Sequence, residues 1–194
     1  MLENLPKSSI KNFLEILKKS IDKLKVKCYN IIKEREVVKM KKAILDLINL
    51  IDNEIQVEFE EQPIEYGLAC EPEEKVIYIG MRTTPIEEKA FFDYVNELDN
   101  EFLQKFPINH YIISILHEVG HCETHEEEQE EEYNFNTELL NTMEEQGFLS
   151  KEDQCKFYVR LTLEKWATQW AIEFIKNNYL LCKQFEDRII KKLC

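Results

Sequence analysis

A five-residue stretch, His117 to His121, constrains this chain of 194 residues more than any other feature. It reads HEVGH and so matches the spacing H-E-x-x-H. On an α-helix, residues i and i+4 lie on one face, so both imidazoles can reach a single metal ion. Glu118, between them, is placed to take a proton from a water molecule that zinc activates. The stretch predicts a helix with His117 and His121 as zinc ligands and Glu118 as general base.

The residues around the motif favour a buried helix. Residues 111–116 are almost entirely apolar, and Pro107 with Asn109 forms a helix start signal. The alternative interpretation is that the two histidines are ordinary side chains on a half-buried helix. The whole chain has only four histidines, and two of them fall at this spacing. That coincidence favours the metal site.

A catalytic zinc usually has three protein ligands and a water, so a third ligand is needed. His125 lies eight residues after His117, about 12 Å along a continuous helix, which is too far; we expect it beside the site or exposed. Glu164 is the better candidate, because Ala167 and Ala171 on the same helix face let a second helix approach closely. A carboxylate there is costly to bury without a partner such as a metal. The alternative is an exposed glutamate on an amphipathic helix.

Charge is distributed unevenly along the chain. Residues 1–42 have twelve Lys or Arg against five Asp or Glu, a net charge of about +7, whereas the remainder has thirteen against thirty-three, about −20. A basic arm can contact nucleic acid, but this arm has only two aromatic residues and no helix-turn-helix pattern. Docking on the acidic body, or a plain solvated face, is favoured, and direct nucleic-acid binding is not expected.

The composition predicts a globular cytoplasmic protein. Hydrophobic residues make up 44% of the chain, and no run approaches the roughly 20 apolar residues that span a bilayer. No secretory signal is apparent at the N-terminus. The six cysteines are irregularly spaced without a C-x-x-C pair, which favours reduced, mostly buried thiols. We expect Cys122 to lie behind the site, because adjacent helical side chains diverge.

The apolar periodicity of the first half predicts two helices followed by strands. A spacing of three and four is typical of amphipathic helices, and a spacing of two is typical of strands. We expect helices over residues 10–24 and 37–51, and strands over residues 55–59, 64–70 and 75–80. The strands predict a small antiparallel sheet.

The second half predicts a mostly helical body. We expect helices over residues 84–103 and through the motif, one long helix from Ser150 to Ile175, and a further amphipathic stretch. Within residues 123–132, seven of ten are glutamate, which is typical of a solvated helix end or a mobile loop. The prediction is an α+β fold, mostly helical, with a small antiparallel β-sheet before the motif helix.

The motif HEVGH together with E-x-x-A-x-x-W-A from Glu164 resembles the ImmA/IrrE family of zinc metallopeptidases, over roughly Val76 to Ile175. The resemblance implies a gluzincin-like, zincin-like domain with Zn²⁺ held by His117, His121 and Glu164 and with Glu118 as general base. It implies a regulatory endopeptidase of bacteria, phages or mobile elements. The implied partner is a protein or peptide substrate, with a cytoplasmic transcriptional repressor as the candidate.

On this basis we expect an N-terminal basic helical region, residues 1–52, and a metallopeptidase-like domain, residues 53–194. An extended substrate would add a strand beside the sheet edge, near Val76 to Gly80. Two other hypotheses stay open. The chain is a regulatory protein that binds a repressor without cleaving it, or it is a helical structural protein with a fortuitous motif.

Overall fold

The structure is a computed structural model that describes residues 35–59, 68–80, 85–125 and 127–190. The predicted helix over residues 10–24 lies outside these ranges. The predicted α+β class is confirmed, since helices dominate and a single three-stranded sheet precedes the motif helix. Among the described residues, no helix combines the length and apolar character needed to cross a membrane.

The first described helix, residues 35–51, packs on the main core. Met40, Ile44 and Leu47 are buried in the same apolar cluster as the centre of the molecule. Arg188 pairs with Asp46 and so joins the C-terminal helix to this one. Residues 35–51 are therefore part of the folded body.

Three short strands follow: β1 (Gln56–Phe59), β2 (Leu68–Glu71) and β3 (Val76–Ile79). Their order is β1-β3-β2, with β2 antiparallel to β3 but β1 parallel to it. The predicted antiparallel sheet is wrong in this respect. After β1 the chain passes to the far side of β3, so β1 and β2 are not neighbours. Period-two alternation identifies strands but not which strands pair.

Helix α2 (Pro85–Leu98) and the short α3 (Phe102–Lys105) replace the single helix predicted over residues 84–103. The break has a local cause, because the Asp99 side chain accepts a hydrogen bond from the Glu101 backbone N–H. Such Asx turns compete with helix continuation. The pair Asp99-Asn100 was the signal in the sequence for a turn at this position.

Helix α4 (His110–Thr124) has the motif and crosses the centre of the molecule. Asn109 caps it, since its side chain accepts a hydrogen bond from the Tyr111 N–H, which confirms the predicted start signal. Helix α5 (Glu127–Glu145) contains most of the glutamate run in its first turns. Glutamates there interact favourably with the helix dipole, which helps the run to be helical.

The predicted long helix from Ser150 to Ile175 is two helices, α6 (Lys151–Tyr158) and α7 (Thr162–Asn177), followed by α8 (Tyr179–Ile190). The break at residues 159–161 has no Gly or Pro signal. It lets α6 pack on α2 while α7 packs along α4. Tertiary packing therefore overrides the continuous periodicity.

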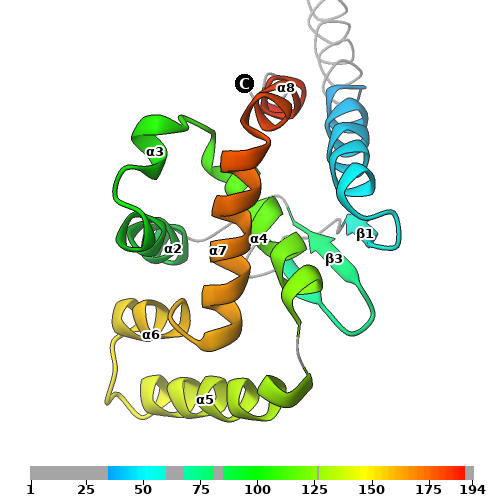
Figure 1. Ribbon diagram of the computed structural model, residues 1–194. Coiled ribbons are helices and arrows are strands. Elements are labelled where there is room, and N and C mark those ends of the chain that lie inside the picture. Colours follow the sequence, from blue (N-terminus) through cyan, green and yellow to red (C-terminus); the bar gives the residue numbers. More distant parts are fainter. Residues whose placement is uncertain (1–34, 60–67, 81–84, 126, 191–194) are drawn as a thin grey trace, which may run out of the picture.

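Helices α4 and α7 lie side by side, with the sheet on one side of the pair and α2 on the other (Figure 1). The close contact is at Gly120, where an added Cβ would lie 2.5 Å from the Ala167 carbonyl oxygen and 2.9 Å from its Cα. Ala167 and Ala171 are fully buried. The predicted close approach through small residues is confirmed, and it brings the backbones of the two site helices into contact.

Candidate metal centre

The three predicted ligands lie together between α4 and α7. The Nε2 atoms of His117 and His121 are 3.2 Å apart. A Glu164 carboxylate oxygen lies 3.1 Å from His117 Nε2, and the other lies 3.6 Å from His121 Nε2. His117 and Glu164 are 7% and 4% exposed, so the interpretation of Glu164 as an exposed glutamate is wrong.

The separations fit the donor set of a tetrahedral metal ion. Zinc–nitrogen and zinc–oxygen bonds of about 2.1 Å place adjacent tetrahedral ligands about 3.4 Å apart. The separation of the two nitrogens, and those from His117 to one Glu164 oxygen and from His121 to the other, fall on both sides of that value. Two imidazole nitrogens and one carboxylate are also a donor set that zinc accepts. The three side chains could therefore hold one metal ion between α4 and α7.

Thr168 fixes which nitrogen of His117 faces the centre. Its hydroxyl donates to the Glu164 carbonyl oxygen at 2.8 Å, so its oxygen is left to accept from His117 Nδ1–H at 3.1 Å. A proton on Nδ1 leaves Nε2 with a free lone pair. The Phe91 ring packs edge-on against the imidazole, with centroids 4.9 Å apart. The His117 ring is thus oriented from two sides.

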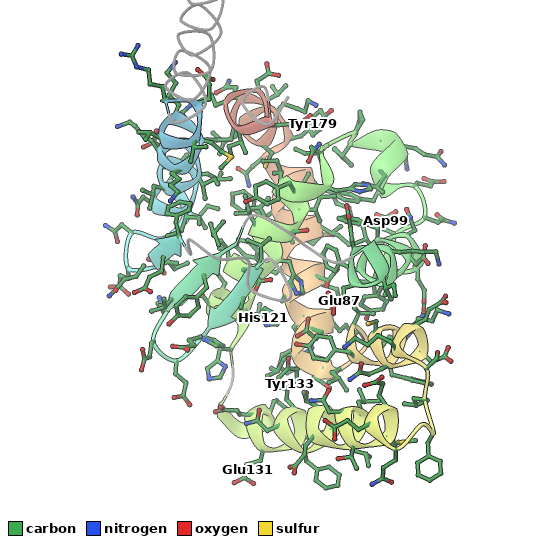
Figure 2. The ribbon with its side chains drawn as sticks, turned by 180° about the vertical axis from the view of Figure 1, so that it is seen from behind. Glu87, Asp99, His121, Glu131, Tyr133 and Tyr179 are labelled. Atoms are coloured by element: carbon green, nitrogen blue, oxygen red, sulfur yellow. The ribbon has the colours of Figure 1, made fainter. Side chains whose placement is uncertain are left out.

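Two tyrosines complete the surroundings of Glu164. The Tyr133 hydroxyl, from α5, donates to the Glu164 carboxylate at 2.7 Å and also contacts the Tyr158 hydroxyl at 2.5 Å. Figure 2 shows Tyr133 directed from α5 toward α7. Neither tyrosine, nor Thr168, was predicted from the sequence to be part of the site. No sequence motif identifies the tyrosines. Thr168 lies four residues after Glu164, and this helical spacing was the signal in the sequence that the two residues share a helix face.

The centre is electrostatically coupled. Burial disfavours the charged form of Glu164, but His121 and His117 hold its pKa well below its usual range. Burial likewise opposes a charge on His121, yet the Glu164 carboxylate raises the pKa of His121 to about 9. A positive charge on His121 and the negative charge on Glu164 thus stabilise each other.

Glu118 lies beside the three ligands and faces the same cavity. Burial raises the pKa of its carboxyl group, although His117 and His121 act in the opposite direction. The cavity has a volume of about 1120 Å³ and is bordered by β2, α2, α5 and α6. It has room for several residues of an extended peptide.

The prediction that an open edge of the sheet lies near Val76 to Gly80 is wrong. Strand β3 lies in the middle of the sheet, with β1 on one side and β2 on the other. Strand β2 is the outer strand on the cavity side, and its residues Leu68 to Glu71 border the cavity. An added peptide strand therefore has β2 as its available neighbour.

His125 is not part of the centre. It caps the C-terminal end of α4 and lies half-buried at the rim of the cavity with Glu73 and Glu130. Cys122 is buried, and its sulfur contacts the sulfur of Cys70 at 3.1 Å, longer than a disulfide bond. Both predictions, that His125 is not the third ligand and that Cys122 packs behind the site, agree with this arrangement. Cys28 and Cys194 lie outside the described residues.

No protein-family model, curated protein or solved structure matches this chain.

Proposed function

We propose that the protein is a zinc-dependent metallo-endopeptidase that acts on a protein or peptide substrate. The observation that supports this most is the joint arrangement of His117, His121 and Glu164 at tetrahedral separations, with Glu118 facing the same cavity. A structural zinc site is usually closed by four protein ligands. Three ligands beside a large cavity leave a position for water and substrate.

A bound zinc ion supplies Lewis acidity, which makes a water molecule more acidic and polarises a carbonyl group. Glu118 accepts the proton as the water oxygen bonds to the scissile carbonyl carbon. When the carbon–nitrogen bond breaks, Glu118 returns that proton to the leaving amine. Thr168 holds the His117 ring, and the Tyr133 hydroxyl holds one oxygen of Glu164.

The substrate would lie extended along β2, where backbone groups of the outer strand are available for pairing. The peptide would then lie between β2 and α6, which borders the cavity along its length from Lys151 to Tyr158. A transcriptional repressor is the candidate substrate by the family resemblance. The proposed site of action is the cytoplasm.

The test separates metal binding from catalysis. Zinc is measured by mass spectrometry on purified protein, and cleavage is followed with an unstructured protein such as casein and with a peptide library. We expect Glu118→Gln to keep zinc and lose cleavage by about 10³-fold or more, because general-base and electrostatic contributions of this size are typical. His117→Ala should lose both.

Glu123→Gln is the matched control, since Glu123 lies on the same helix but is exposed. It should keep both zinc and cleavage. If Glu118→Gln cleaves as fast as the wild type, the enzyme proposal fails. If the wild type binds zinc and a partner protein without cleavage, the chain is instead a binding protein with this fold.

A further inference from the structure

A second group of metal-binding side chains lies at the rim of the cavity. Glu73 comes from the turn between β2 and β3, His125 from the C-terminal cap of α4, and Glu130 from the first turns of α5. One ligand atom from each residue lies within 4.8 Å of the others. None of these residues belongs to the centre formed by His117, His121 and Glu164, so the group is a separate feature.

His125 is the residue that distinguishes this group from an ordinary acidic surface. Both of its ring nitrogens are buried, and neither has a hydrogen-bond partner among the described residues. Buried polar atoms in folded proteins nearly always have a partner, in the protein or in a bound water or ion. Among the described residues, the carboxylates of Glu73 and Glu130 are the ligand atoms grouped with this ring. One imidazole and two carboxylates thus lie close enough together to share a single cation.

The negative charge around the group also favours a bound cation. Seven of the ten residues from 123 to 132 are glutamates, and this stretch extends from the end of α4 into the first turns of α5. Like charges gathered at one place raise the free energy of the folded state and attract counter-ions. A divalent cation at the rim would reduce this repulsion where α4 ends and α5 begins.

We propose that Glu73, His125 and Glu130 form a second metal site for a divalent transition-metal ion of the zinc class. An imidazole in the donor set favours such ions over Ca²⁺ and Mg²⁺, which prefer ligands that are all oxygen. The site joins three segments, the β2–β3 turn, α4 and α5. It does not depend on the proposed peptidase activity.

The second site also has a consequence for the first. Glu130 lies three residues before Tyr133 on α5, and the Tyr133 hydroxyl donates to Glu164. A cation held by Glu130 would fix the start of α5 against the end of α4. The cation at the rim thus acts as a positioning element for the wall that holds Glu164.

The experiment measures zinc per protein chain after dialysis against zinc-free buffer, with Ca²⁺ and Mg²⁺ as comparison ions. We expect the wild type to hold two equivalents, His117→Ala to hold one, His125→Ala to hold one, and the double variant to hold none. In the His117→Ala background, added zinc should raise the thermal midpoint, and this rise should vanish when His125 is also replaced.

Glu130→Gln is a milder second variant, useful if His125→Ala fails to fold, and it should weaken the second equivalent by about tenfold or more. Glu131→Gln is its matched control, because Glu131 is exposed and projects away from the body of the molecule (Figure 2). It should keep both equivalents. If His125→Ala keeps the wild-type stoichiometry, a water molecule satisfies the ring and the proposal is overturned. If His117→Ala holds as much zinc as the wild type while His125→Ala holds less, the proposed peptidase centre does not bind zinc. The proposal of the rim site is then supported on its own.

Discussion

Thr168 links the two helices of the site through hydrogen bonds that no sequence motif predicts. The hydroxyl of a helical threonine often donates a hydrogen bond to the backbone carbonyl four residues earlier, and Thr168 donates in this way to the Glu164 carbonyl oxygen. Here the same hydroxyl oxygen also receives the Nδ1–H of His117. One side chain therefore orients the His117 ring on the other helix and contacts the backbone of Glu164.

The prediction for Thr168→Val is weaker zinc binding with little change in shape. Valine keeps the branched outline but removes the acceptor for Nδ1–H. Loss of such outer partners typically costs 10–100-fold in metal affinity, so we expect a decrease of that order. Competition with a chromophoric chelator measures it.

Thr168→Ser keeps the hydroxyl and serves as the control, with affinity close to that of the wild type. Equal affinity in Thr168→Val would mean that packing of Phe91 alone orients the His117 ring.

At the scale of elements, the contact between α4 and α7 is what brings His117 and His121 close to Glu164. The two helices meet backbone to backbone at Gly120 and Ala167. On propensity alone, Gly120→Ala should stabilise α4 by about 1 kcal/mol. The added methyl would, however, lie 2.5 Å from a backbone oxygen that cannot move without the whole of α7. The steric effect should therefore prevail.

We expect Gly120→Ala to lower the free energy of unfolding by about 3 kcal/mol, the upper end of overpacking costs. It should also weaken zinc binding, because the ligands on the two helices are pushed apart. Urea unfolding measures the first effect and chelator competition the second. Ser114→Ala, which adds alanine elsewhere on α4, should change neither by much; a stabilised Gly120→Ala variant would contradict the close contact.

Elements and side-chain groupings that depend on local interactions could be predicted from the sequence. The spacing of His117 and His121, the Asn109 cap and the spacing of Ala167 and Ala171 from Glu164 are each contained within a single helix, so these patterns could be read from the sequence. The parallel pairing of β1 with β3 and the break between α6 and α7 depend on distant partners. Tyr133 was missed for the same reason, since 31 residues separate it from Glu164.

At the scale of the whole molecule, the helix over residues 35–51 is part of the core. It buries Met40, Ala43, Ile44, Leu47 and Ile48. Each large apolar side chain contributes about 1.5–3 kcal/mol when buried, and a typical domain is stable by only about 5–15 kcal/mol. The contribution of this one helix is thus comparable to the total stability.

Deletion of residues 1–51 is therefore expected to abolish cooperative unfolding, whereas deletion of residues 1–34 should leave the described core intact. Circular dichroism during thermal unfolding distinguishes the two truncated proteins. A cooperative transition in the shorter protein near the wild-type midpoint would show that the remainder folds without this helix.

The sequence position of Glu164, the proposed third ligand, has a consequence for how the proposed zinc site would assemble. His117 and His121 are neighbours on one turn of helix, but Glu164 lies 47 residues beyond His117. A newly formed α4 can offer an ion only two imidazoles, and the carboxylate arrives when α7 docks at Gly120. The visible spectrum of cobalt in place of zinc should therefore change again when the carboxylate joins the two imidazoles, and this second change would report the docking of α7.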